Sequence, residues 1–285
     1  MLIFYLIILF LLFIILYTPK KSNISVSLII TTYNNPKVLY HVIQSALNQN
    51  YKNYEIIIAD DGSTDETKNM INIIKEISKI KIVHSWQEDY GFRAASSRNK
   101  AILKSSNEYI IMIDGDMILD KNFIYDHVNI AEKNVFIQGS RVLLNNKLTN
   151  KILKNGETEL NLINIKNISN KINLIRSYFL SLFFRSKNNK IKGIRTCNFS
   201  LWKEDIYKVN GFNNDFIGWG REDSEFVIRL FNAGLQRKNL KFYGKAYHMY
   251  HPENSRKSLE KNDKLLEETI NKKLKYCKNG LRQLK

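Results

Sequence analysis

The sequence predicts an α/β fold: a mostly parallel, doubly wound, Rossmann-like sheet with helices on both faces, preceded by one N-terminal transmembrane helix. Three observations support this. From Ser25 onward, short apolar runs alternate with segments of helical spacing. Several of these runs end in polar or acidic clusters, and residues 1–17 carry no charge. Continuous apolar strands joined by helices are typical of a parallel sheet that is covered on both faces.

The first half of the chain contains the clearest elements. Strands are expected at residues 26–32, 54–59, 80–84 and 109–113. Helices are expected at residues 36–47, 65–77 and 94–103, the second of them capped by Ser63 or Thr64. Polar clusters follow three of the strands, at residues 31–35, 60–65 and 114–116. Ligands of doubly wound sheets bind beyond the carboxyl ends of the strands, so we expect a site at this edge.

Residues 1–18 are predicted to be a transmembrane anchor. The apolar run is just long enough to cross a bilayer as a helix. It has neither the basic start nor the small-residue cleavage site of a signal peptide. Because the nearest charges, Lys20 and Lys21, follow the run, the positive-inside rule places the catalytic domain in the cytoplasm, at a bacterial inner membrane. The alternative, a buried N-terminal helix, is hard to reconcile with a helix that is apolar on every side.

The net charge of +17 predicts anionic partners, such as phosphates, an acidic bilayer surface or nucleic acid. We expect no nucleic acid partner, because the basic residues do not form an aromatic-interleaved recognition motif. A basic surface facing anionic lipid explains them. Cys197 and Cys277 are the only cysteines, which excludes a disulfide framework and suits a reducing compartment.

Composition divides the rest of the chain. We expect one domain over residues 22–254, with a first half at 22–140 and a second half at 193–254. Between them, residues 141–192 form an insert rich in Asn and Lys. Within the insert, residues 172–185 concentrate apolar side chains between basic ends. They form either an amphipathic element on the membrane or over the active site, or an ordinary core helix. Residues 255–285 are expected to form a charged helical tail, solvated or on the membrane surface rather than catalytic.

Two acidic clusters follow predicted strands. Asp114 and Asp116 flank a glycine, which lets the chain turn so that both carboxylates face one hard divalent ion, and such an ion can bridge them to a diphosphate. Asp60 and Asp61 end the second strand, where they can accept hydrogen bonds from a ribose hydroxyl or a base N–H. Solvated turns and helix caps are the alternative for both clusters.

Two arginines, Arg93 and Arg98, lie at the start of the helix expected at residues 94–103. Guanidinium groups at a helix N-terminus are suited to bind phosphate oxygens. Either arginine could instead be a surface ion-pair partner.

Residues 218–223, with the sequence Gly-Trp-Gly-Arg-Glu-Asp, suggest an acceptor site. Two glycines around Trp219 predict a tight, mobile loop with an aromatic platform for a sugar ring. Asp223 then follows at a helix start, where it can accept the proton of an acceptor hydroxyl. The alternative is a solvated acidic first turn, which the helix dipole also favours.

His248 and His251 complete the candidate residues. In a strand, residues three apart point to opposite faces, so both would bind one ion only if the chain turned. One imidazole that completes an aspartate-bearing metal site is the hypothesis, and a structural histidine is the alternative.

Together these motifs resemble the family 2 glycosyltransferases of the GT-A fold, in their bacterial form with a galactosyltransferase-like C-terminal segment. The resemblance covers about residues 25–256. It implies that residues 22–140 are the nucleotide-sugar and metal-binding half of the domain, and residues 193–254 the acceptor and catalytic half. It depends on the order and spacing of Thr31-Thr32-Tyr33-Asn34, Asp60-Asp61-Gly62-Ser63, Gly91-Phe92-Arg93, Asp114-Gly115-Asp116, residues 218–225 and residues 248–252.

The resemblance implies an inverting transferase that uses Mn²⁺ or Mg²⁺ to move a hexose or N-acetylhexosamine from a UDP-sugar to a glycan or lipid-linked acceptor in cell-surface polysaccharide biosynthesis. Asp223 matches the catalytic base, and Glu222 the acid that helps to hold the acceptor. Trp219 and Gly220 would contact the acceptor sugar. Asp116 and His248 match metal ligands, with His251 in reserve. The donor site would comprise Thr31, Tyr33, Asp60, Asp61, Arg93, Arg98 and Asp114.

Arg221 departs from the glycine found at this position in animal galactosyltransferases, which leaves acceptor choice and loop motion open.

Two other functions remain as alternatives. A nucleotidyltransferase would form a nucleotide-sugar, but its glycine-rich loop after the first strand is replaced here by residues 31–34. A non-catalytic, basic, membrane-associated binding protein would show no donor hydrolysis.

Overall fold

The computed structural model describes residue 5 and residues 23–156, 166–252 and 255–284. The strands are β1 (Val26–Thr32), β2 (Tyr54–Asp60), β3 (Ile82–Trp86), β4 (Tyr109–Asp114), β5 (Met117–Leu119), β6 (Val135–Gly139), β7 (Val142–Leu144), β8 (Ile168–Ser169), β9 (Lys187–Asn188), β10 (Asn198–Trp202), β11 (Gln236–Leu240) and β12 (Ala246–His248). The helices are α2 (Pro36–Leu47), α3 (Asp65–Ile77), α4 (Ala94–Lys104), α5 (Phe123–Asn129), α6 (Asn146–Asn155), α7 (Tyr178–Leu182), α8 (Lys203–Lys208), α9 (Glu222–Asn232) and α10 (Leu259–Asn271), with 3₁₀ turns η2 (Lys171–Leu174) and η3 (Leu281–Leu284).

The main sheet has eight strands in the order β3-β2-β1-β4-β10-β6-β11-β9. The first four in this order are parallel, as the sequence predicts. β10 runs antiparallel to β4 and β6, β11 is parallel to β6, and β9 is antiparallel to β11. The fold is therefore mixed α/β: the N-terminal half of the sheet is wholly parallel as expected, whereas the C-terminal half combines antiparallel pairs with the parallel pair of β6 and β11.

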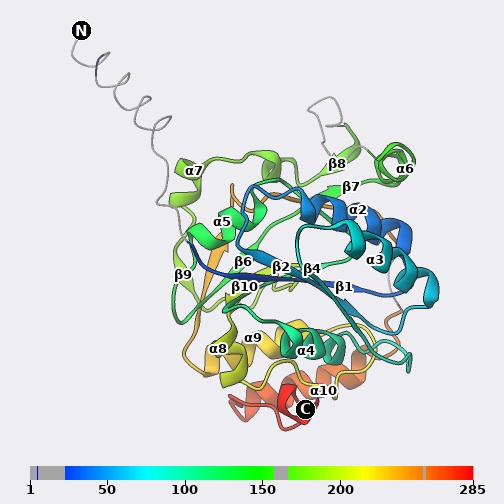
Figure 1. The fold of residues 1–285 in the computed structure, drawn as a ribbon. Helices are drawn as coiled ribbons and strands as arrows, with labels where there is room; N and C mark the ends of the chain where they lie inside the picture. The colour runs from blue at the N-terminus through cyan, green and yellow to red at the C-terminus, as the bar shows by residue number, and fades with distance from the viewer. Residues whose placement is uncertain (1–4, 6–22, 157–165, 253–254, 285) are drawn as a thin grey trace.

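Helices cover both faces of this sheet, with α2 and α3 on one face and α4, α8 and α9 on the other (Figure 1). β1 shows why. Its side chains alternate between the faces, so Leu28 and Ile30 pack in the core on the α2 side while Ile29 packs in the core on the α4 side. All three are fully buried. This burial on both faces explains the continuous apolar sequence of the strand.

The elements predicted in the first half of the chain are all present, with one offset. β3 begins at Ile82 rather than at residue 80. The Ser78 hydroxyl donates to the carbonyl oxygen of Ile80 and accepts from its N–H, which keeps these residues in a turn before the strand.

A second sheet of four strands, in the order β5-β12-β7-β8, brings distant segments together. β12 pairs antiparallel with β5, which places His248 opposite Met117, and it pairs parallel with β7. The sheet thus brings the end of β12 to the residue that follows Asp116.

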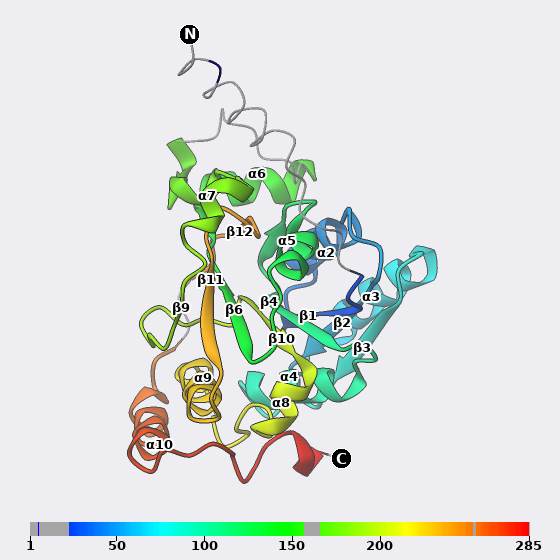
Figure 2. The ribbon, with the colours of Figure 1, turned by 90° about the vertical axis from the view of Figure 1, so that its left-hand side faces the viewer.

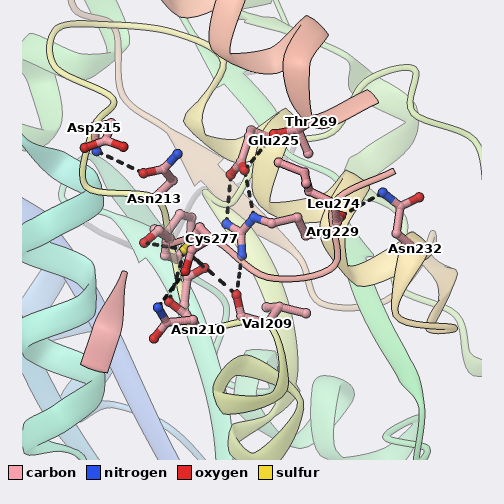
Figure 3. Close-up of polar contacts among 12 residues, drawn as sticks. Val209, Asn210, Asn213, Asp215, Glu225, Arg229, Asn232, Thr269, Leu274 and Cys277 are labelled. Atoms are coloured by element: carbon pink, nitrogen blue, oxygen red, sulfur yellow. Dashed lines mark hydrogen bonds and ion pairs between the residues drawn. The ribbon is translucent and has the colours of Figure 1, made fainter. Parts of the chain in front are cut away.

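The C-terminal tail packs onto the domain, with α10 beside α9 in both ribbon views (Figures 1 and 2). Figure 3 shows the buried polar contacts that hold it there. Arg229 of α9 forms a bidentate pair with Glu225, at 2.7 and 2.8 Å, and Glu225 also accepts from the Thr269 hydroxyl of α10. Asn210 donates to the carbonyl oxygen of Cys277. The tail is thus bound to α9, the helix that carries Glu222 and Asp223, and is not merely a solvated extension.

Within the described residues, no helix is both long and apolar enough to cross a membrane. The predicted anchor at residues 1–18 lies outside them, apart from Tyr5. The insert at residues 141–192 contains α6, η2, α7 and short strands, and its residues 157–165 also lie outside the described part. Its apolar segment forms η2 and α7, which leave Leu182 and Phe183 exposed, so it is not an ordinary core helix.

His127 of α5 connects the helix layer to β10. Its Nδ1 lies 2.8 Å from the hydroxyl of Ser200, and its Nε2 lies 2.9 Å from Oδ1 of Asn198. The ring is fully buried, and this burial lowers the pKa of His127 to about 3. The folded protein therefore keeps this imidazole neutral in mild acid, where the unfolded chain would protonate it.

We predict that His127 makes the fold sensitive to acid. Below the unfolded-state pKa of about 6.5, the unfolded chain binds a proton that the folded chain does not, so stability falls as the pH falls. Between pH 7 and pH 5, the unfolding free energy of the native protein should fall by about 2 kcal/mol more than that of the His127→Gln variant. Urea unfolding of both proteins at the two pH values measures it. An equal loss in both would mean that His127 takes up the proton in the fold.

Candidate active site

Asp114, Gly115 and Asp116 form the turn that joins β4 to β5. A Cβ at Gly115 would lie 2.7 Å from the carbonyl oxygen of Thr31, so only glycine allows the turn to press against the end of β1. From this turn Asp114 contacts Arg98 of α4, while Asp116 faces two histidines. The two carboxylates therefore serve two different clusters.

The first cluster joins Asp116 to both histidines. Oδ2 of Asp116 lies 3.4 Å from Nε2 of His248 and 3.2 Å from Nε2 of His251. β12 ends at His248, and the chain then turns, so the two imidazole centroids are 5.1 Å apart. The alternation of a continuous strand would have kept the rings apart; the turn brings both to one carboxylate.

The residues of this cluster fit a cation. Ligand atoms of Asp116, His248 and His251 lie within 4.8 Å of one another. Oδ1 of Asp116 is buried and has no hydrogen-bond partner, an arrangement that a bound cation would satisfy. Burial lowers the pKa of His248, which favours the neutral imidazole that ligates metals. The hydrogen bond that His251 donates to Asp116 raises the pKa of His251 to about 9, so a cation bound there would displace a proton.

The second cluster surrounds Arg98, which is buried. Its Nη2 lies 3.3 Å from Oδ1 of Asp114, and its Nη1 lies 3.4 Å from Oε1 of Glu222 and 3.3 Å from Oδ1 of Asp223. Nε donates to the hydroxyl of Thr31 at 3.3 Å. One guanidinium thus holds carboxylates from β4 and α9 against the end of β1, a geometry that only a planar group with several donors provides.

Burial and mutual repulsion oppose ionisation of these acids. Burial, together with the charge of Asp223, raises the pKa of Glu222 to about 7, although Arg98 pulls it down. Burial also raises the pKa of Asp114 to about 6, again against the effect of Arg98. Burial by itself would lower the pKa of Arg98, but the three carboxylates raise it above its ordinary value. The cluster therefore combines a permanent cation with acids whose pKa values are near neutral pH.

Asp223 is fixed by a second partner, Thr196. The Thr196 N–H donates to Oδ2 of Asp223 at 2.9 Å, and its hydroxyl donates to Oδ1 at 2.7 Å. Thr196 is buried, directly before β10, whereas the Asp223 side chain remains partly exposed. These bonds hold the carboxylate in one orientation, as a positioned general base requires.

At the end of β2, both aspartates are already bonded within the protein. Oδ1 of Asp60 accepts from the Ser63 N–H, and its Oδ2 lies 2.8 Å from Nε2 of His84. Asp61 accepts from the N–H of Arg93 at 2.6 Å and from Gln87 at 2.5 Å. Burial raises the pKa of Asp61. The two carboxylates thus shape the turn after β2 and tie it to the start of α4.

Aromatic side chains stand around this turn. Tyr33 directly follows β1, and Trp86 is the last residue of β3. Each side chain is about half exposed. The Tyr33 hydroxyl donates to Oδ2 of Asp89 at 2.8 Å, and the Trp86 indole donates to the carbonyl oxygen of Ser63 at 3.0 Å. The guanidinium of Arg93 bonds the carbonyl oxygen of Glu88 and lies 4.9 Å from the ring of Tyr90, so it is engaged within its own loop.

The loop before α9 exposes Trp219 in part. Gly218 and Gly220 have φ of +80° and +105°, and Arg221 has φ of +77°. The last value lies in the left-handed region, where a side chain is strained and glycine is favoured. Here Arg221 is held by Asp263 of α10 at 2.5 Å, and Asn262 donates to the carbonyl oxygen of Gly220 at 2.9 Å.

The structure thus brings most of the predicted residues together along the carboxyl edge of β1, β2 and β4. The contacts of Arg98 differ from those expected. The sequence suggests a phosphate contact for Arg98; the contacts present are with carboxylates. Sequence reasoning missed Thr196, which lies 27 positions from Asp223. It also missed Arg141, which donates to Sγ of Cys197 at 3.0 Å and whose charge acts on Asp114 and His248. For Thr196, the available signal was the polar pair Arg195-Thr196 shortly before β10.

Comparison with protein families gives two matches. The model described as glycosyl transferase family 2 matches residues 27–192, more than half of the chain. The model described as N-terminal domain of galactosyltransferase matches residues 180–252. Together they include the end of β1, the Asp114–Asp116 turn, the loop before α9 and both histidines, and they confirm the resemblance found in the sequence.

The similar proteins either are much longer than this chain or match only a part of it. The chain is 24% identical over 264 residues to the chondroitin synthase of Escherichia coli, covering 82% of this chain and 36% of that protein. It is 44% identical over 91 residues to the UDP-Glc:alpha-D-GlcNAc-diphosphoundecaprenol beta-1,3-glucosyltransferase WfaP of Escherichia coli, covering 32% of this chain and 35% of that protein. The chain spans only 36%, 26% and 25% of the length of the first three synthases matched.

Among solved structures, S. aureus TarS 1-349 in complex with UDP matches with a TM-score of 0.56 and 17% sequence identity. The match covers 86% of this chain and 65% of that one. At this identity the likeness shows a shared fold, and it confirms the GT-A-like α/β architecture.

We predict that Arg98→Met costs about 3–5 kcal/mol of unfolding free energy, because it removes a buried cation and leaves three partly buried carboxylates facing one another. The control is Arg221→Met, which breaks the exposed pair with Asp263 and should change stability by less than about 0.5 kcal/mol. Urea unfolding of the three proteins measures both. Equal stability of the Arg98 variant and the native protein would contradict the central role given to this guanidinium.

Proposed function

Because the chain belongs to glycosyl transferase family 2, we propose that it transfers a hexose or N-acetylhexosamine from a UDP-sugar to a glycan or lipid-linked acceptor, with inversion and with the help of a divalent metal ion. The observation that carries the proposal is the position of Asp223. This carboxylate is oriented by Thr196 and Arg98 beside the Asp114–Asp116 turn, with a half-exposed tryptophan nearby in sequence.

The reaction would be one displacement at the anomeric carbon. The acceptor hydroxyl loses its proton to Asp223 as its oxygen forms the new bond to that carbon. The bond between the carbon and the diphosphate oxygen breaks, and UDP leaves with the electron pair. Attack from the face opposite the leaving group inverts the configuration. A positioned base of this kind contributes about 10²–10⁴ in rate.

Glu222 suits the role of acceptor contact. Its raised pKa, near 7, means that a substantial fraction carries a proton at neutral pH and can donate a hydrogen bond to a sugar oxygen. Arg98 contacts both neighbouring acids, whereas Thr196 bonds only to Asp223, so Asp223 is the more firmly oriented of the two. The ring of Trp219 offers an apolar face for the acceptor sugar, with the guanidinium of Arg256 at 5.9 Å.

A divalent ion held by Asp116, His248 and His251 would neutralise charge that develops on the leaving diphosphate. Two imidazole ligands favour a transition-metal ion such as Mn²⁺ over Mg²⁺, which prefers oxygen ligands. The predicted His248 and its reserve, His251, are thus both proposed as ligands.

The donor nucleoside is proposed to bind at the turn after β2. Asp61 and the exposed ring of Tyr33 lie on this turn or beside it, and Arg93 joins it to the start of α4. Thr31 and Asp114 would lie nearer the diphosphate, with Arg98 behind them. The likeness in fold to a structure that contains UDP supports UDP as the nucleotide of the donor.

The acceptor is proposed to be lipid-linked, because one relative is named for a diphosphoundecaprenol acceptor and because the chain is strongly basic. The predicted anchor and a cytoplasmic, membrane-attached catalytic domain agree with such a substrate. No observation favours a nucleotidyltransferase or a non-catalytic binding protein.

We predict that Asp223→Asn lowers turnover by at least about 10²-fold while the affinity for UDP is unchanged. The amide keeps the size of the side chain but cannot accept the acceptor proton. Glu76→Gln, on the exposed last turn of α3, is the control and should retain full turnover. Release of UDP measures turnover, and calorimetry measures UDP binding. Native turnover in the Asp223 variant would contradict its assignment as the base.

We predict that Asp116→Asn weakens Mn²⁺ binding at least tenfold, or about 1.4 kcal/mol. His248→Ala and His251→Ala should each weaken it too, because both rings contact the same carboxylate oxygen. Electron paramagnetic resonance of free Mn²⁺ in the presence of UDP measures binding without relying on activity. Unchanged affinity in the His251 variant would remove it from the ligand set, and unchanged affinity in all three would exclude this metal site.

A further inference from the structure

A group of large apolar side chains on and after α7 has no cover in the described part of the chain. We define the apolar ridge as Leu180, Leu182, Phe183 and Phe184, all exposed, with Phe183 at 69%. Ile172 and Ile175, a few residues before, are also about half exposed. Ser181 points the other way, is buried, and accepts a hydrogen bond from Arg185. The segment therefore presents apolar groups outward, where solvent contact is unfavourable.

The segment that carries the ridge is basic, and the nearest acid that pairs with it beyond the ridge is Glu132, which contacts Lys187. Residues 160–203 contain neither Asp nor Glu. Lys190 and Lys192 are exposed just beyond the ridge, Lys171 is exposed before it, and the ammonium of Lys241 lies 4.6 Å from the ring of Phe184. An apolar ridge with a positive rim is the complement of a bilayer surface, whose headgroups are anionic and whose interior is apolar.

Other occupants fit less well. A second copy of the chain docked on the same face would bring its positive rim against this one, and like charges oppose that contact. A stretch of apolar side chains, in turn, has no counterpart in the phosphate backbone of a nucleic acid.

We propose that the apolar ridge inserts into the surface of an anionic membrane, with Lys171, Lys190 and Lys192 on the lipid headgroups. This contact is separate from the predicted anchor at residues 1–18, and it does not depend on sugar transfer. It would hold the domain in a fixed orientation on the bilayer, where a lipid-linked acceptor would be found.

α3 provides a matched control for this surface. Ile73 and Ile77 of α3 are as exposed as the ridge, but acidic and basic residues alternate around them. α3 and α7 lie at opposite sides of the molecule in Figures 1 and 2. Both native cysteines are buried, so a thiol-reactive fluorophore will label an introduced cysteine selectively.

The test uses the full chain with Ser186→Cys, beside the ridge, or Asn72→Cys, on α3, each carrying a polarity-sensitive fluorophore. Each protein is reconstituted into phosphatidylcholine vesicles with and without phosphatidylglycerol. We expect a blue shift at position 186, and its quenching by lipids with nitroxide-labelled acyl chains, only with phosphatidylglycerol present and not at position 72. Adding Leu182→Gln and Phe183→Gln should abolish both signals at 186.

Three results would overturn the proposal. The first is no response at position 186 in anionic vesicles. The second is a blue shift that lipid-borne quenchers do not affect, which would mean that protein, not lipid, covers the ridge. The third is the same response in vesicles without phosphatidylglycerol, which would exclude an anionic surface as the partner.

Discussion

The buried guanidinium of Arg98 is the contact on which the site depends. It holds Asp114 of β4 together with Glu222 and Asp223 of α9, and it reaches Thr31 at the end of β1. These elements come from both family matches, residues 27–192 and 180–252, so one cation joins the proposed donor half to the proposed acceptor half. α10, which lies beyond both matches, braces the other side of α9 through Thr269 and the loop through Asn262. Removing the cation would leave three carboxylates to repel one another in a buried site.

Much of this could be predicted because two strong local signals agree. Strands β1, β2 and β4 are buried on both faces, so their apolar runs are unbroken, and the polar residues that end them are conspicuous. Parallel pairing then requires those ends to meet at one edge. This is why Asp60, Asp114 and Asp116 could be placed together from the sequence. The loop before α9 was also visible, because glycines around a tryptophan are rare in a helix or strand.

What the sequence could not supply were contacts between distant segments. Arg98 lies more than one hundred positions from Glu222, and no local pattern shows that a basic residue in α4 will be buried among acids. The contact between Thr196 and Asp223 was also not predictable, because it depends on β10 running antiparallel beside β4. The two histidines could not both be assigned to Asp116 without knowing that β12 ends at His248. The packing of the tail could not be predicted for the same reason. Its sequence is mostly charged, and nothing in it shows that Asn262 and Thr269 will be buried.

The central claim, that this site transfers sugar from a UDP donor, is tested most directly by a donor panel on the full chain in detergent. Release of free nucleotide is measured for several nucleotide-sugars, with and without Mn²⁺ and with a lipid-linked acceptor present. The account predicts release of UDP from one UDP-sugar, dependent on the metal and increased by the acceptor. Absence of release from every donor, together with absence of UDP binding, would contradict it.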